Sequence, residues 1–308
     1  MRTIKKERNR DFMVLNLSDP QLSNDEWRDG EKNREILVNT IEELVDRVKP
    51  DLITVSGDVA WAGNKIAYEA LGKFLDGFKI PWAVVWGNHD NQGGPELIEE
   101  IVQLYEKFSF FCYERGDESL GNGNYVIGIE EDGALVEAII MMDSHDRMPF
   151  TDKDGNVGEA WAKLIPEQIV WYREQIQMLQ ELGCKETILI THIPIFAYRK
   201  AFETVNSEEL VGVGHEEVSC YAVEDGVFEA VKELDSTKYI IVGHDHVNNW
   251  MIPYEGVQLI YALKTGPGCY WEPELNGGTA IRITSDGVAD VHHEFVEVRK
   301  THWHRLFI

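Results

Sequence analysis

Short apolar runs alternate with amphipathic stretches along the first third of the chain. Three apolar runs, Met13–Leu17, Leu52–Val55 and Trp82–Trp86, each stop at a polar cluster, which is typical of buried strands that end in loops. Between them, Asn33–Val48 and Ile66–Phe78 carry apolar residues at helical spacing. This β-α-β-α-β order predicts right-handed crossovers and a mostly parallel sheet.

The rest of the chain continues the pattern with more strands than helices. The further predicted strands are Ala138–Met142, Thr187–Ile190, Tyr239–Val242, Val257–Ala262, Ala280–Thr284 and His292–Val298. A helix is predicted over Pro166–Leu182, with proline in its first turn. The sequence shows neither an internal repeat nor a linker rich in Gly, Pro or Ser. We therefore expect residues 1–308 to form a single α/β domain, in which the basic residues 1–11 are a solvated N-terminal arm.

Unusual polar residues stand where five of the predicted strands end. The five clusters are Asp19-Pro20-Gln21, Gly57-Asp58, Gly87-Asn88-His89-Asp90, Thr191-His192 and Gly243-His244-Asp245-His246. Taken singly, each has an ordinary explanation, since Gly-Asp is common in turns and Asn can cap a helix. Together they hold four of the ten histidines. Because ligands gather outside the carboxyl ends of strands in open α/β sheets, one shared site is the simpler interpretation.

The residue types in these clusters are those of a metal centre. Imidazole and carboxylate groups suit iron, manganese and zinc. The carboxylate of Asp58 has two oxygens, so it could bridge two ions, and the glycines beside the candidate ligands permit a close approach. Two metal ions about 3.5–4 Å apart can grip a phosphoryl group and generate hydroxide near neutral pH. The clusters therefore predict two divalent or trivalent metal ions (Mn, Fe or Zn) in a phosphohydrolase.

The formal net charge of −25 narrows the range of partners. An acidic surface repels phosphate backbones and anionic lipids, so we expect neither a nucleic-acid nor a membrane partner. The same field repels a phosphorylated substrate, and bound metal ions would offset it. The four cysteines are widely spaced without a C-x-x-C pair, which argues against a structural zinc site or a redox motif. No secretion signal is visible, so a cytoplasmic protein is expected.

The order of the motifs from Asp19 to His246, written D-x-(H), GD, GNHD, a lone His and GHxH, resembles that of the calcineurin-like metallophosphoesterases. The segments Ile80–Trp82, Met142–Ser144, Thr191–Pro194 and Val242–Asn248 are similar to the purple-acid-phosphatase-like branch. The resemblance implies a four-layer α/β/β/α sandwich with a dinuclear centre between its sheets. It also implies hydrolysis of phosphate monoesters by a metal-activated water. The alternatives are a phosphodiesterase or pyrophosphohydrolase with the same centre, or a catalytically silent metal-binding scaffold.

The resemblance also implies a role for each motif residue. The first metal would bind Asp19, Asp58 and His246, and the second would bind Asp58, Asn88, His192 and His244, with Asp58 as the bridge. His89 would be the catalytic residue that contacts the phosphoryl group and stabilises the transition state or protonates the leaving oxygen. Asp90 would orient the ring of His89, as outer carboxylates often do.

Two residues depart from the family pattern. Gln21 replaces a histidine on the first metal; its amide oxygen can ligate but is a neutral and harder donor, so we expect a more weakly held or more manganese-like site. Relatives that act on pyrophosphate bonds or phosphoproteins also carry glutamine there, so activity need not be lost. Trp61 replaces a tyrosine three residues after the bridging aspartate and cannot ligate, so the purple charge-transfer colour should be absent.

Substrate recognition rests on three weaker candidates. His145 follows a predicted strand end, His215 lies in a glycine-rich stretch, and Tyr270 follows the turn Gly266-Pro267-Gly268. An ordinary surface loop or a packing role is the alternative for each. The expected substrate is a small phosphorylated molecule or a phosphoprotein. Four C-terminal histidines outside the motifs are expected to be surface or strand residues rather than ligands: His292, His293, His302 and His304.

Overall fold

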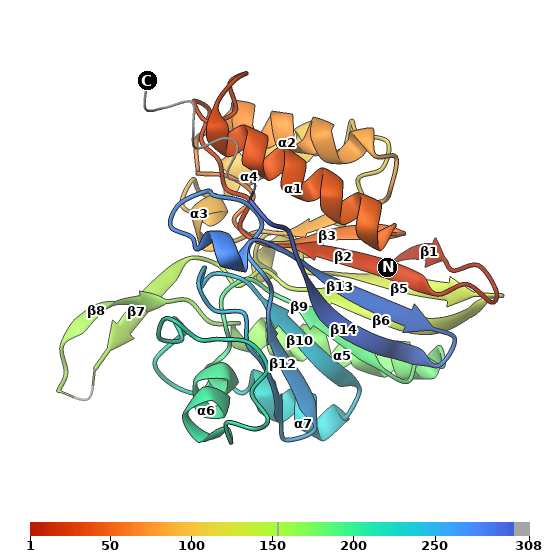
Figure 1. The fold of residues 1–308 in the computed structure, drawn as a ribbon. Helices are drawn as coiled ribbons and strands as arrows, with labels where there is room; N and C mark the ends of the chain where they lie inside the picture. Colours follow the sequence, from red (N-terminus) through yellow and green to blue (C-terminus); the bar gives the residue numbers. More distant parts are fainter. Residues whose placement is uncertain (153, 299–308) are drawn as a thin grey trace.

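Two β-sheets lie between two layers of helices in the computed structural model, which describes residues 1–152 and 154–298 (Figure 1). The five-stranded sheet has the order β14-β13-β2-β3-β4, and the seven-stranded sheet has the order β1-β5-β6-β9-β10-β12-β11. The helices α1, α2 and α4 cover the first sheet, and α5, α6 and α7 cover the second (Figure 1). The expected four-layer α/β/β/α sandwich is confirmed. His302 and His304 lie outside the described residues.

The five-stranded sheet joins the N-terminal third of the chain to two C-terminal strands. Its elements and helices are β2 (Phe12–Leu17), α1 (Lys32–Val48), β3 (Leu52–Ser56), α2 (Lys65–Gly77), β4 (Trp82–Val85), α3 (Asn88–Asn91), α4 (Pro95–Tyr105), β13 (Gly277–Thr284) and β14 (Gly287–Phe295). The strands β2, β3 and β4 are parallel, whereas β13 is antiparallel to both β2 and β14. The predicted β-α-β-α-β series is confirmed to within one residue at each boundary.

The seven-stranded sheet and its helices come mainly from the middle of the chain. They are β1 (Arg2–Lys5), β5 (Tyr125–Glu131), β6 (Ala134–Met141), α5 (Pro166–Glu181), β9 (Thr187–Ile190), α6 (Phe196–Thr204), α7 (Val227–Leu234), β10 (Thr237–Val242), β11 (Met251–Tyr254) and β12 (Val257–Tyr261). The strands β6, β9, β10 and β12 run parallel to one another. A hairpin of β7 (Arg147–Thr151) and β8 (Val157–Trp161) projects away from the body (Figure 1).

The prediction of a solvated N-terminal arm is wrong for residues 2–6 of that segment. Arg2–Lys5 forms β1, which pairs in parallel with the edge of β5. Lys6 is buried and its ammonium group lies 2.6 Å from the carboxylate of Glu131. Basic residues at a sheet edge are a common protection against edge-to-edge association, so this segment reads as polar although it is a strand.

Residues on the two faces of the seven-stranded sheet divide the apolar core into two clusters. One face packs on the five-stranded sheet with Ile139, Ile188 and Ile241, and the other packs on α5, α6 and α7 with Ile140, Leu189 and Ile240. Burial of both faces explains why these strands are nearly continuous apolar runs in the sequence. The parallel strands of both sheets end at the same edge of the sandwich, and their loops meet there.

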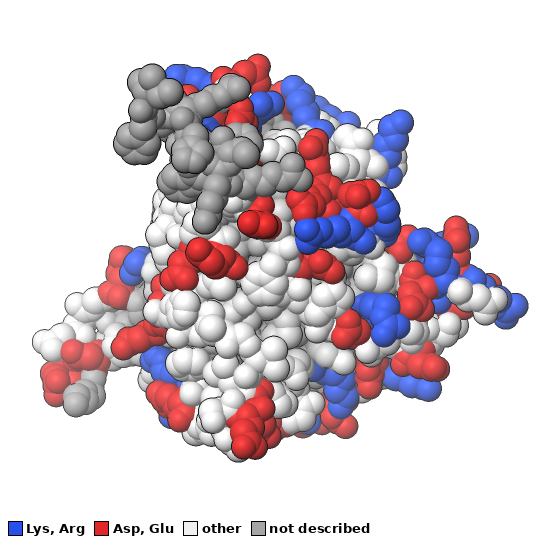
Figure 2. All heavy atoms as spheres, viewed as in Figure 1, with Lys and Arg blue, Asp and Glu red and all other residues white. Residues whose placement is uncertain are grey.

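The surface carries the strong acidic charge expected from the composition. Figure 2 shows Asp, Glu, Lys and Arg side chains mostly around the margin of one face, with a broad uncharged area in its centre and lower part. Among the described residues, no helix combines the length and apolar composition that crossing a membrane requires.

Candidate metal centre

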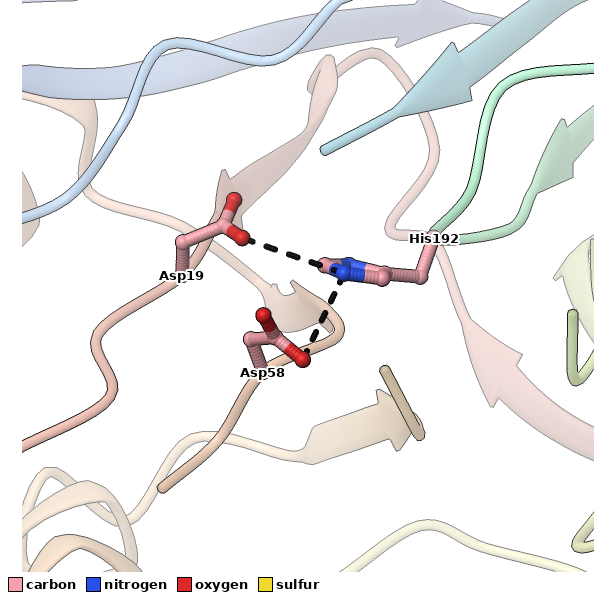
Figure 3. Close-up of side chains that lie close together, drawn as sticks. All are labelled: Asp19, Asp58 and His192. Atoms are coloured by element: carbon pink, nitrogen blue, oxygen red, sulfur yellow. Dashed lines mark ion pairs between the residues drawn. The ribbon is translucent and has the colours of Figure 1, made fainter. Parts of the chain in front are cut away.

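Two carboxylates and an imidazole converge where the two sheets meet. Asp19 follows β2, Asp58 follows β3 and His192 follows β9, so both sheets contribute (Figure 3). One ligand atom from each of the three lies within 4.8 Å of the other two. The Nε2 atom of His192 is 3.4 Å from Asp58 Oδ1 and 3.9 Å from Asp19 Oδ1. All three side chains are buried, so this is a compact set of nitrogen and oxygen donors inside the protein.

Tight backbone turns bring these donors together. Asp19, Asp58 and His244 all have positive φ angles, of 52°, 49° and 77°. Such angles are uncommon for residues other than glycine and cluster at functional sites. Gly57 has a φ of 95°, and a Cβ atom added to it would lie 2.3 Å from Nδ1 of His192. The prediction that glycines allow a close approach of the ligands is therefore confirmed at this position.

Three further candidates lie around this core. Oδ1 of Asn88 is 3.1 Å from His192 Nε2, and Nε2 of His246 is 3.3 Å from Asp19 Oδ1. The ring of His244 packs edge-on against that of His192, with 5.2 Å between the ring centroids. All three side chains are buried. The structure thus brings together residues from all five of the strand-end clusters.

Two buried amide side chains on the loops of the centre have polar atoms that lack hydrogen-bond partners among the described residues. These are both polar atoms of the Gln21 side chain and Nδ2 of Asn88. Leaving a buried polar group unpaired costs about 1–3 kcal/mol, so native proteins rarely retain such groups without a ligand or water to satisfy them. The carboxylates, imidazoles and amide oxygens together fit a pair of metal ions.

Two of the histidines are oriented by backbone carbonyls. Nδ1 of His192 donates to the carbonyl oxygen of Ser56, and Nδ1 of His246 donates to that of Tyr270, each at 2.8 Å. In both rings Nε2 is therefore the atom directed at the carboxylates. This is the arrangement by which metal-ligating histidines are usually held in one tautomer.

Opposite charges face one another in the centre and shift the pKa values of its groups. Burial alone would raise the pKa of Asp19, but the hydrogen bond from His246 and the charges of His246, His192 and Lys264 lower it below the usual value. Burial opposes the charged form of His192, yet the carboxylates of Asp58 and Asp19 hold the pKa of this histidine above its usual value. The raised pKa means that His192 holds its second proton more tightly than usual. A metal ion that binds to this ring would displace the proton, so we expect metal binding to release protons.

Lys264 is a charged group at the centre that the sequence interpretation missed. Its side chain is only 3% exposed, and Nζ donates to the backbone carbonyl of Asp19 at 2.7 Å. Burial lowers the pKa of this lysine to about 8, although the nearby carboxylate of Asp19 opposes the shift. The available signal was its position, because Lys264 comes directly after the apolar run that forms β12, like the acidic residues after β2 and β3.

His89 lies at the outer side of the centre. Its backbone N–H donates to Asp58 Oδ1 at 2.9 Å, which ties the histidine to the carboxylate expected to bridge the metals. Its ring is partly exposed and packs on Trp61, with 4.3 Å between the ring centroids. Nδ1 pairs with Oε1 of Gln92 at 3.0 Å, so Nε2 is the ring atom left to meet a substrate.

The prediction that Asp90 orients His89 is wrong. The carboxylate of Asp90 is fully buried and accepts hydrogen bonds from the backbone N–H groups of Gly87, Val59 and Ala60 at 2.8–3.3 Å. The hydroxyl of Tyr68 also donates to it at 2.7 Å. Successive residues on a helical turn point in directions about 100° apart, so the two side chains face opposite environments. Burial, together with the charge of Asp58, raises the pKa of Asp90 to about 7.

Two of the three substrate-binding candidates have their ring atoms engaged elsewhere. Nε2 of His145 lies 2.9 Å from Oε1 of Gln168, and its Nδ1 lies 3.6 Å from the buried carboxylate of Asp143. His215 pairs through Nδ1 with the carboxylate of Glu272 at 2.9 Å on the surface. These contacts fit the alternative packing and surface roles, and substrate binding by either histidine stays a prediction.

Tyr270, the third candidate, lies directly against the centre. Its ring stacks on His246 with 4.3 Å between the centroids, and its hydroxyl donates to Glu216 at 2.9 Å. Tyr270 is therefore the substrate-binding candidate that contacts a proposed metal ligand.

Asp245, between the two histidines of the last cluster, turns away from the centre. It accepts hydrogen bonds from the hydroxyl of Tyr261 and from a backbone amide of the loop after α6.

Known proteins resemble this chain in sequence and in fold. A "Probable inactive purple acid phosphatase 28" from Arabidopsis thaliana is 24% identical over 294 residues, which is 86% of this chain and 70% of that protein. "Phosphatase DCR2" from Saccharomyces cerevisiae is 26% identical over 267 residues; this alignment covers 79% of the chain but only 44% of the yeast protein. A solved dimetal phosphatase from Danio rerio has a TM-score of 0.58 at 12% identity, covering 92% of this chain and 98% of that one.

The family profile described as calcineurin-like phosphoesterase matches residues 12–248. That span begins at β2 and ends just after His246, so it encloses all five strand-end clusters. The likeness to the Danio rerio structure concerns the fold alone. Because the profile covers most of the sequence, the chain belongs to the calcineurin-like phosphoesterase family, whose members are hydrolases that act on phosphate esters.

Proposed function

We propose that this protein is a metal-dependent phosphatase that hydrolyses phosphate monoesters. The observation that carries the proposal is the buried convergence of two carboxylates, imidazoles and unpaired amides, with a partly exposed histidine at its outer side. The proposed metal ligands are Asp19, Gln21, Asp58, Asn88, His192, His244 and His246, with Asp58 as the bridge. Manganese, iron and zinc all suit this donor set.

The residues of the chain divide the work between binding and proton transfer. A pair of metal ions in such a site supplies positive charge that polarises a phosphoryl group and makes a water molecule nucleophilic near neutral pH. With both ring nitrogens protonated, His89 donates Nδ1–H to Gln92 and presents Nε2–H to the substrate, where it donates a hydrogen bond to a phosphoryl oxygen or a proton to the leaving oxygen. Gln92 holds the opposite ring nitrogen, which sets the direction of this donor. Trp61 packs on the ring and limits its rotation.

Two alternative functions use the same residues. Gln21 gives some support to a phosphodiesterase or pyrophosphohydrolase, because relatives that act on pyrophosphate bonds also carry glutamine at this position. A silent metal-binding scaffold is the other alternative, since the Arabidopsis relative is named as probably inactive. The position of His89 argues against the scaffold, because metal binding alone has no need of a partly exposed histidine tied to Asp58. The proposed substrate is a small phosphorylated molecule or a phosphoprotein.

The test compares para-nitrophenyl phosphate with bis-para-nitrophenyl phosphate. Chelated protein would be re-supplied separately with manganese, iron, zinc and magnesium before each assay. We expect metal-dependent turnover of the monoester to exceed that of the diester. Faster cleavage of the diester would favour the phosphodiesterase, and cleavage of neither substrate with any metal would favour the scaffold.

The His89→Ala variant separates catalysis from metal binding. We expect turnover to fall by about 100-fold or more, as for loss of a proton donor, while the metal content stays close to that of the parent protein. Metal content would be measured by elemental analysis of the same samples. A parallel loss of metal and activity would contradict the proposed role and indicate that His89 is structural.

A further inference from the structure

Three partly exposed aromatic side chains each pack on a histidine of the candidate centre. The pairs are Trp61 on His89, Trp161 on His244 and Tyr270 on His246, with ring centroids 4.3, 4.4 and 4.3 Å apart. The three rings, which we call the aromatic rim, come from the loop after β3, the end of β8 and the loop after β12. Three separate segments of the chain thus each place an aromatic ring against a histidine of the centre.

The aromatic rim lies outside the metal-binding layer. His244 and His246 are 8% and 4% exposed, whereas Tyr270 is 47% exposed and both tryptophans are partly exposed. A substrate whose phosphoryl group reaches the buried carboxylates must therefore leave the rest of its structure among these rings. The rim is the part of the site that can distinguish one leaving group from another.

A series of neighbouring side chains links the two tryptophans. Arg147 lies over the ring of Trp161, with Cζ 4.0 Å from the centroid. Burial raises the pKa of Asp146, which precedes Arg147 in the chain. Gln92, Arg147 and His89 lower this pKa, so all three lie near the carboxylate of Asp146. Gln92 in turn pairs with His89, which packs on Trp61. Trp161 and Trp61 are therefore connected through Arg147, Asp146, Gln92 and His89, the last of which is the proposed proton donor.

A hollow adjoins Ala62, which follows Trp61 in the chain, and Gln92, which pairs with His89. It has a volume of about 500 Å³, and its lining also includes Gly93, Glu96 and Glu100. Ala62 donates its backbone N–H to the carbonyl of His89. The leaving oxygen has to be next to His89 if this residue protonates it, so the group attached to that oxygen lies near Trp61, which packs on the ring of His89. Volumes of about 300–1,000 Å³ are usual for small-molecule sites.

We propose that the natural leaving group carries a planar aromatic ring and that Trp61 is the residue that selects it. The inference rests on the proposed function, because it takes the position of the leaving group from the role of His89. An indole face favours a stacked ring over a saturated group of the same size, since aromatic pairs interact beyond their area of contact. Saturated leaving groups such as glycerol gain nothing comparable from the rim.

The test uses benzyl phosphate and cyclohexylmethyl phosphate. Both leaving groups are primary alcohols with a six-membered ring, so they differ in planarity much more than in reactivity. We expect kcat/KM for the benzyl ester to be higher by about 3- to 10-fold, which is the range of aromatic pair interactions. Trp61→Leu should abolish the preference, whereas Trp61→Phe should retain part of it. Inhibition by inorganic phosphate, which has no leaving group, measures separately how far each variant disturbs His89 itself.

Two controls keep the outcomes distinct. Trp171 on α5 is also partly exposed but lies on the outer side of the seven-stranded sheet, so Trp171→Leu should leave the preference intact. Calorimetric titration of the metal-loaded protein with benzylphosphonate and cyclohexylmethylphosphonate measures the same preference without turnover. A protein that binds both equally, or keeps the preference after Trp61→Leu, overturns the inference. Absence of hydrolysis with a preserved binding preference would overturn the proposed function instead.

Discussion

Replacing Asp90 by alanine tests whether this residue holds two loops of the centre together and does not orient His89. The carboxylate of Asp90 accepts three backbone hydrogen bonds that join the loops after β3 and β4, as well as one from Tyr68. Those loops carry Asp58 and Asn88. If Asp90 holds the loops, its removal should reduce the stability of the fold and the affinity for metal together, before it affects the chemistry of His89.

The expected size of the effect follows from the number of lost partners. Three buried N–H donors, of Gly87, Val59 and Ala60, lose their acceptor, and an unpaired buried donor costs about 1–3 kcal/mol. Tyr68 keeps a second acceptor in the carbonyl of Ala60, and removal of a buried carboxylate also relieves its desolvation. We therefore expect Asp90→Ala to lower the free energy of unfolding by about 3–5 kcal/mol.

Gln92→Leu is the matched variant, because Gln92 is the residue that pairs with Nδ1 of the His89 ring. Gln92 is exposed, so unfolding should change by less than about 0.5 kcal/mol, while turnover should fall by about 10-fold as His89 loses its orientation. Urea unfolding of the chelated proteins and elemental analysis of the reconstituted ones provide the two readouts. Unchanged stability and metal content in Asp90→Ala, with a loss of turnover alone, would refute the reasoning and restore Asp90 as the residue that orients His89.

Three further predictions concern the centre and a buried acid remote from it. Asp58→Asn removes the charge of the proposed bridge, so elemental analysis should find the centre largely empty; two fully retained ions would contradict the bridging role. Gly57→Ala adds a Cβ atom 2.3 Å from His192 at a φ of 95°, so we expect a loss of about 2–4 kcal/mol of unfolding free energy and weaker metal binding in calorimetry, and an unchanged protein would argue against this close approach. Burial raises the pKa of Glu137 well above its usual 4.5, so above that pH the folded state binds more protons than the unfolded state. The free energy of unfolding therefore falls as the pH rises from 4.5 towards the raised pKa. Glu137→Gln should therefore be more stable than the parent protein in urea unfolding at pH of about 8, with a smaller gain at pH of about 5, and a gain that does not grow with pH would count against the assignment.

The candidate centre was predictable because its residues lie in short local patterns. Asp19, Asp58 and His192 each follow an apolar run that reads as a strand on its own, and parallel strands end at the same edge of a sheet. Side-chain chemistry then favours metal binding for such a cluster. The hairpin of β7 and β8 was not predicted, because its alternation of polar and apolar residues faces solvent on both sides and no core enforces it.

By itself, the sequence determined the β-α-β-α-β series of the first third of the chain and the set of candidate ligands, because periodicity and donor chemistry depend on residues close together in the chain. Only the tertiary structure decided which way Asp90 turns, that Arg2–Lys5 joins a sheet edge, and which rings surround the centre. Lys264 and Asp19 are 245 residues apart, and their contact exists only because β12 and β2 end at the same place between the two sheets. Contacts of this kind depend on the packing of distant segments, and no local pattern of residues records them.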